Sequence, residues 1–106
     1  MKSWKMFEKK LASYLGGEVR SRALRGEAVE DVQWGAFSVE AKTRKKVPQY
    51  IHDWLAQAKE NCEGRVPVVV WHQDRTAMGE QIVLLSLNDL VWLAERWGIN
   101  EDYVSK

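Results

Sequence analysis

The sequence has few of the residues that stabilise secreted or membrane-embedded proteins. It contains one cysteine, Cys62, so neither an intramolecular disulfide nor a cysteine-rich zinc site can form within the chain. Two prolines exclude a proline-rich linker. No apolar run approaches the ~18 residues of a membrane span, and the lysine-containing N-terminus lacks the pattern of a secretory leader. We therefore expect a cytoplasmic protein without membrane contact.

The length and composition fit one globular unit. The chain has 106 residues, of which 45% are hydrophobic and 29% are charged. These values are ordinary for a domain with its own core, and the sequence shows no internal repeat or low-complexity tract. We expect a single domain that spans residues 1–106.

The net charge of +1 conceals an uneven distribution along the chain. Residues 1–25 carry seven Lys/Arg and two Glu, 26–41 carry four acids and no base, 42–46 carry four bases, and 47–106 carry five bases and nine acids. Two basic stretches around an acidic one suit a polyanion held beside bound cations. Ordinary solvated surface charge is the alternative interpretation.

The hydrophobic periodicity predicts alternating helices and strands. Apolar residues recur at helical spacing from Ser3 to Leu15, and Gly16 with Gly17 marks the end of that helix. Asn88 is the expected N-cap of the last helix. The predicted helices are 3–15, 48–61 and 90–97, and the predicted strands lie within 31–42, 66–71 and 82–87.

This order of elements predicts the fold class. The segment 66–71 is a nearly continuous β-branched run, typical of a buried central strand. A strand, a helix and a second strand in succession form a right-handed crossover. We therefore expect an α/β fold with a central mixed β-sheet flanked by helices.

The segment from Asp31 to Lys42 contains the candidate catalytic and metal-binding residues. Phe37, Val39 and Ala41 alternate with polar residues, so Glu40 and Lys42 are expected on one face of a strand. A turn at Trp34-Gly35 would pair this strand with an earlier one and bring Asp31 to the same end. Asp31, Glu40 and the carbonyl of Ala41 would form an oxygen-only magnesium site, and Lys42 would stabilise negative charge.

Residues 30–44, Glu-Asp-Val-Gln-Trp-Gly-Ala-Phe-Ser-Val-Glu-Ala-Lys-Thr-Arg, resemble the core motif of the PD-(D/E)XK nuclease superfamily. The resemblance extends to the helix and strand that follow, and it is strongest to small archaeal and phage Holliday-junction-resolvase-like members. It implies a restriction-endonuclease-like core and Mg²⁺-dependent DNA cleavage, with Mn²⁺ as a substitute. It also implies that Glu8 and Gln57 contribute to the catalytic site.

Two features leave alternatives open. Glu30 stands where the family motif has proline, and Glu27 or Glu30 could replace Asp31 as the first carboxylate. An exposed strand face with a simple ion pair would also explain Glu40 and Lys42 without any catalysis. Gln57 is equally well explained as a solvated helix residue.

The expected partner is DNA, branched or duplex, and symmetric cutting would require a homodimer. Trp34 is a candidate to stack on an unpaired base. The main functional prediction is a structure-selective endonuclease, and the alternatives are an exonuclease or nickase acting on flaps or ends and a non-catalytic DNA-binding protein of the same fold. Residues assigned as a group to phosphate contacts are Arg20, Arg22, Arg25, Arg44, Lys45 and Lys46.

Overall fold

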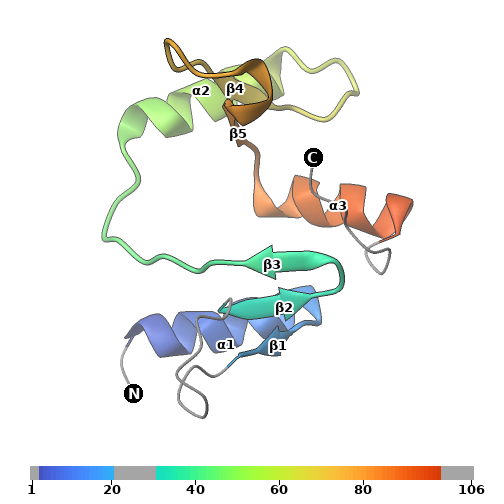
Figure 1. Ribbon diagram of the computed structural model, residues 1–106. Helices are drawn as coiled ribbons and strands as arrows, with labels where there is room; N and C mark the ends of the chain where they lie inside the picture. The colour runs from blue at the N-terminus through green and yellow to red at the C-terminus, as the bar shows by residue number, and fades with distance from the viewer. Residues whose placement is uncertain (1–2, 21–30, 99–106) are drawn as a thin grey trace. The chain divides into compact units, whose positions relative to one another are not determined.

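The computed structural model describes residues 3–20 and 31–98. These residues form a small α/β protein with three helices and two antiparallel sheets, which confirms the predicted α/β class (Figure 1). The chain divides into two compact units, residues 1–44 with 94–106 and residues 45–93. The sequence predicts a single domain over residues 1–106.

In the described residues, the first unit contains a helix, a three-stranded meander and the end of the last helix of the chain. Helix α1 spans Ser3–Leu15, and the strands are β1 (Glu18–Val19), β2 (Val32–Trp34) and β3 (Phe37–Val39). The strand order is β1-β2-β3, and both pairings are antiparallel. The predicted helix and the predicted hairpin are both confirmed.

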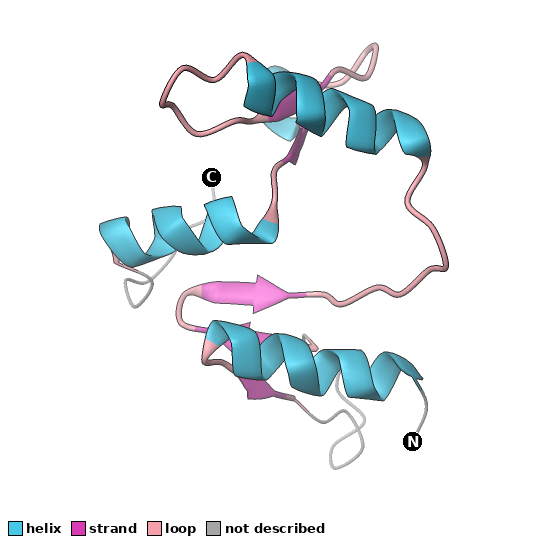
Figure 2. Ribbon diagram, turned by 180° about the vertical axis from the view of Figure 1, so that it is seen from behind, coloured by secondary structure: helices cyan, strands magenta, loops and turns pink. Residues whose placement is uncertain are grey.

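The core of this unit lies between α1 and the sheet. Leu11, Ala12 and Leu15 are buried on one side of α1, as their helical spacing predicts. Val32 and Trp34 are 0% and 2% exposed, and they share one face of β2 because side chains alternate along a strand. Helix α1 lies along this face of the sheet (Figures 1 and 2).

The burial of Trp34 overturns its predicted role as a stacking platform for DNA. Its ring stacks on Phe37 with centroids 4.8 Å apart and an interplanar angle of 24°. Both aromatic residues flank the Gly35-Ala36 turn and face the core, so only 2% of Trp34 reaches solvent. The hypothesis that Trp34 stacks on an unpaired base is therefore wrong.

The connection from α1 to β1 depends on two glycines with different tasks. Gly16 has φ +73°, the left-handed conformation that ends many helices, and the Gly17 N–H donates to the Ala12 carbonyl at 2.8 Å. Gly17 lies so close to β2 that an added Cβ would come within 2.5 Å of the backbone oxygen of Gln33. Gly17 is thus required for the close approach between the helix end and the sheet.

We expect Gly17→Ala to destabilise the protein by about 1–3 kcal/mol, because a backbone oxygen cannot move aside without disturbing the β1–β2 pairing. The matched control is Gly79→Ala, where an added Cβ would meet nothing within 4 Å. Urea unfolding followed by circular dichroism measures both changes. Equal midpoints for the two variants would contradict this account of Gly17.

The second unit packs a helix on a two-stranded hairpin. Helix α2 spans Gln49–Glu60, and strands β4 (Val69–Trp71) and β5 (Ile82–Leu84) pair in antiparallel fashion. The loop between them contains the short 3-10 helix η1 (Met78–Glu80). Helix α2 lies across the hairpin (Figure 2), and Pro48 immediately precedes it, close to the predicted start.

Strand β4 is shorter and less buried than the sequence predicts. It begins at Val69 instead of Val66, and Val70 is 60% exposed. Pro67 explains the late start, because proline has no N–H to donate and restricts the residue before it. The predicted buried central strand over 66–71 is therefore corrected to a three-residue strand of a hairpin.

The sheets also differ from the predicted mixed sheet. In the part of the chain that the structure describes, the strands form two separate sheets, and every pairing is antiparallel. Each sheet joins strands that follow one another along the chain, and such local hairpins close the shortest loops.

Helix α3 spans Leu87–Trp97 and begins three residues before its predicted start. The hydroxyl of Ser86 accepts a hydrogen bond from the Asp89 N–H at 3.2 Å, which is the contact of an N-cap residue. Ser86, not Asn88, therefore caps the helix. Gly98, with φ +84°, ends it as the sequence predicts.

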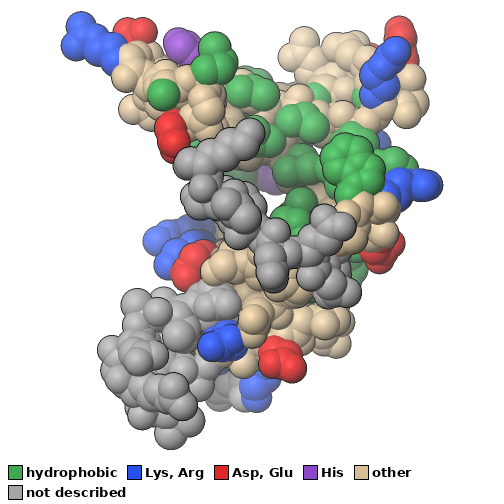
Figure 3. Space-filling view, turned by 45° about the vertical axis from the view of Figure 1, so that its right-hand side comes forward, with side chains coloured by type: hydrophobic (Ala, Val, Ile, Leu, Met, Phe, Trp, Pro, Cys, Tyr) green, Lys and Arg blue, Asp and Glu red, His purple; other side chains and the backbone are tan. Residues whose placement is uncertain are grey.

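The surface retains many apolar side chains, which Figure 3 shows in green. In the second unit these include Met78, Val70 and Ile82, which are 83%, 60% and 55% exposed. Among the helices of the described residues, none has the length and apolar character needed to cross a bilayer.

Candidate functional site

The candidate site lies at the open end of the β2–β3 hairpin. Val32 and Val39 form the last pair of the ladder. Asp31 directly precedes Val32, and Glu40 directly follows Val39. Because Val32 is fully buried against α1, the alternation along each strand directs Asp31 and Glu40 to the other face of the sheet. The hairpin thus brings together two carboxylates that are nine positions apart in the sequence.

Asp31 is tied to both neighbouring segments. One carboxylate oxygen, Oδ2, accepts a hydrogen bond from the backbone N–H of Ala41 at 2.8 Å. The backbone carbonyl of Asp31 accepts a second bond from the N–H of Arg20 at 3.0 Å. The side chain is half-buried, so its position is determined by the fold to a greater degree than that of an exposed carboxylate.

The bond from Ala41 also explains why β3 ends before its predicted boundary. The sequence predicts a strand that continues through Glu40 and Lys42, whereas β3 ends at Val39. The N–H of Ala41 bonds to a side-chain carboxylate and not to a backbone carbonyl, so the ladder stops there. Glu40, Ala41 and Lys42 therefore lie just beyond the strand.

Glu40 and Lys42 nevertheless lie on the same side, as predicted. Nζ of Lys42 is 3.8 Å from Oε2 of Glu40, and their side chains are 73% and 50% exposed. An exposed ion pair of this kind contributes little to stability. Both side chains are therefore accessible to a ligand at little conformational cost.

Arg20 and Gln33 extend the polar face beside this pair. The guanidinium of Arg20 donates to Oε1 of Gln33, and Gln33 lies on the same face as Asp31, two positions further along β2. The sequence assigns Arg20 to phosphate contacts but misses Gln33. The alternation of Gln33 with Val32 and Trp34 is the signal that places it on the polar face.

The remaining predicted residues occupy several places. Glu8 lies half-buried on α1, which covers the opposite face of the sheet. Gln57 lies on α2 in the second unit. Arg44, Lys45 and Lys46 are exposed in the extended segment before α2. Residues of the predicted set that lie outside the described part of the chain are Arg22, Arg25, Glu27 and Glu30.

The donor set at the hairpin end fits magnesium. Asp31 and Glu40 offer hard carboxylate oxygens on one face, and magnesium is commonly held by one or two carboxylates, with waters and substrate phosphates completing its shell. Across residues 3–20 and 31–98, no cluster of three or more His, Cys, Asp or Glu residues is arranged to hold a metal. The two carboxylates would therefore need oxygens from the backbone, water or substrate.

Comparisons of the chain with family models, with curated proteins and with solved structures gave no match. The fold and the site define only a class: a small α/β protein with two carboxylates and a lysine at the end of a hairpin. Any narrower assignment depends on the chemistry of these residues.

Proposed function

We propose that this protein is a magnesium-dependent DNA endonuclease of the PD-(D/E)XK type, selective for branched structures. The observation that carries the proposal is the register of the β2–β3 hairpin. It puts Asp31 and Glu40 directly beyond the last residue pair, one on each arm of the hairpin. The bond from Ala41 to Asp31 and the contact of Lys42 with Glu40 add the remaining members of the motif to the same place.

Each side chain has a defined task in this mechanism. Asp31 and Glu40 would hold magnesium through their carboxylate oxygens, and the Ala41 carbonyl is the proposed third ligand. When bound, magnesium neutralises phosphate charge and activates a water for attack. The ammonium group of Lys42 binds a phosphate oxygen and stabilises the charge that develops there.

Basic side chains hold the DNA backbone. Arg20 lies on the polar face of the sheet beside Asp31 and contacts a neighbouring phosphate. Arg44, Lys45 and Lys46 are exposed, follow Lys42 and Thr43 in the sequence, and neutralise further phosphates. Gln57 and Glu8 are proposed participants by resemblance alone.

The proposed core is restriction-endonuclease-like. The family pattern has a helix, an acidic residue before a strand with Glu-X-Lys, a second helix and a further strand, and the order α1, β2–β3 hairpin, α2 and β4 is compatible with it.

The endonuclease proposal is tested by incubating the protein with labelled DNA of four kinds: a four-way junction, a flap, a linear duplex and a single strand. We expect cutting of the junction in Mg²⁺ or Mn²⁺ and none in EDTA, because the two carboxylates act only through a bound cation. Paired, symmetric nicks would further support a homodimer, since one site cuts one strand.

Other outcomes of the panel select the alternatives. Cutting confined to flaps or ends would indicate an exonuclease or nickase. The scarcity of further acidic ligands near Asp31 and Glu40 in the described residues favours a second candidate, a DNA-binding protein without catalysis. Binding of all four DNAs with no cutting in either metal would select that candidate.

A further inference from the structure

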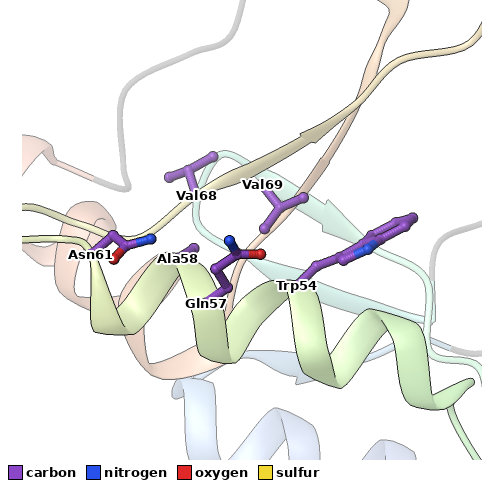
Figure 4. A pocket seen from close by; sticks show the side chains of 6 residues that line it. All are labelled: Trp54, Gln57, Ala58, Asn61, Val68 and Val69. Atoms are coloured by element: carbon purple, nitrogen blue, oxygen red, sulfur yellow. The ribbon is translucent and has the colours of Figure 1, made fainter.

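A hollow in the second unit lies between α2 and the start of β4 (Figure 4). It is open to solvent and has a volume of about 340 Å³. The side chain of Gln57 projects from α2 into it, with Trp54 toward one end and Asn61 toward the other. The residues that line it are Trp54, Gln57, Ala58, Asn61, Val68 and Val69.

The side chains that line this hollow suit a ligand that is flat, uncharged and polar at its edge. No charged side chain lines it, so a phosphate or carboxylate would find no counter-ion there. Within the described part of the chain, no hydrogen bond involves the side-chain amide of Gln57 or Asn61. Each amide offers both a donor and an acceptor, and the two valines and the indole supply apolar walls.

A nucleobase has these properties, because it combines an aromatic face with an edge of donors and acceptors. Asparagine and glutamine amides pair well with the edge of adenine, and indoles stack on bases. A base paired inside a duplex cannot enter such a hollow, whereas an unpaired or extruded base can.

Further aromatic side chains lie next to the hollow, and basic side chains precede α2. Trp54 contacts Trp71 and Tyr50, with ring centroids 4.9 and 5.1 Å away. Tyr50 and Trp71 are 47% and 37% exposed, so their rings remain available to neighbouring bases. Two exposed cations, Lys45 and Lys46, precede the helix in the same unit and suit the phosphates of the strand.

We propose that the hollow between α2 and β4 binds an unpaired nucleobase of a DNA strand. The identity of the polymer rests on the proposed nuclease function, but the binding itself does not require a metal or a cut. Base binding in the hollow would explain which feature of DNA the protein recognises. This feature is an unstacked base, which branched and flapped DNA exposes. Gln57 then contacts the base, and Trp54 takes the stacking role that the buried Trp34 cannot perform.

The test compares two duplexes of equal length and sequence, one fully paired and one with a single extra adenine, by fluorescence anisotropy in EDTA. We expect the wild-type protein to bind the bulged duplex about tenfold more tightly, the effect of one stacked and hydrogen-bonded base. Asn61→Leu keeps the size of the side chain but removes the amide, and it should reduce the preference to about twofold.

The matched control is Gln49→Leu, the same loss of an amide on the same helix. Gln49 bonds to Asp53 and does not line the hollow, so this variant should keep the tenfold preference. Circular dichroism spectra should show that both variants retain the wild-type fold. Equal binding of the two duplexes by wild type, or an undiminished preference in Asn61→Leu, would overturn the proposal.

This experiment separates the two proposals. A protein that prefers the bulged duplex but cuts no DNA in magnesium or manganese refutes the nuclease and leaves the base site intact. A protein that cuts DNA but binds both duplexes equally refutes only the base site.

Discussion

Replacing Glu40 with glutamine is expected to reduce DNA cleavage at least about hundredfold, the scale of losing one group that stabilises the transition state. The substitution keeps the size of the side chain and removes one of the two carboxylate charges that would hold magnesium. Lys42→Met removes the neighbouring ammonium group and should reduce the rate by a similar factor. Single-turnover cleavage of a labelled junction at saturating protein measures both changes.

The chain offers a matched control for these variants. Glu63 and Arg65 form a second pair of an acid and a base two positions apart, with N···O 4.0 Å and side chains 85% and 81% exposed. This pair has the same spacing as Glu40 and Lys42, whose separation is 3.8 Å, but it lies far along the chain from Asp31. Glu63→Gln and Arg65→Met should therefore leave the cleavage rate within about twofold of wild type, as surface changes usually do.

Binding in EDTA separates catalysis from affinity. Glu40→Gln removes a negative charge and should bind the junction at least as tightly as wild type, whereas Lys42→Met should lower the salt slope of binding by about one. If Glu40→Gln and Glu63→Gln cleaved equally well, Glu40 and Lys42 would be an ordinary surface ion pair and the nuclease mechanism would be wrong.

The parts of the fold that the sequence predicts well are those that local patterns determine. The apolar spacing of α1, closed by Gly16, defines a helix over 3–15, and the alternation around Gly35 defines the β2–β3 hairpin. The site follows from the same alternation, since Asp31 and Glu40 occupy the same end of that hairpin.

The parts that the sequence misses depend on competition between groups of similar chemistry. Ser86 and Asn88 are both good N-caps, and only the bond from the Asp89 N–H to the Ser86 hydroxyl decides between them. The end of β3 is likewise decided by the Asp31 carboxylate, which takes the Ala41 N–H that a longer ladder would use. Neither choice is visible in hydrophobic periodicity.

The hollow beside α2 could not be predicted from the sequence, because it depends on how α2 and the start of β4 are placed. Trp54, Gln57 and Asn61 lie at helical spacing, so the sequence places them on one side of α2. That side carries an aromatic and two amides, which the pattern alone describes as a mixed surface. The position of Val68 and Val69 against it turns this surface into a lined hollow.

The burial of Trp34 leads to the second large expected effect. Trp34→Ala should destabilise the protein by about 3–5 kcal/mol, because it removes a side chain that is 2% exposed and stacked on Phe37 at 4.8 Å. A loss of that size is a large share of the 5–15 kcal/mol typical of a domain. Urea unfolding followed by circular dichroism provides the measurement.

Trp97 supplies the matched control, because it is the same residue type in a helix and is 77% exposed. Trp97→Ala should change the stability by less than about 0.5 kcal/mol. The conservative variant Trp34→Phe keeps an aromatic ring in the core, and it should retain the wild-type affinity for the bulged duplex because Trp34 does not reach DNA. Loss of this affinity in a folded Trp34→Phe protein would indicate that Trp34 contacts DNA. That result would contradict the burial of Trp34 between α1 and the hairpin.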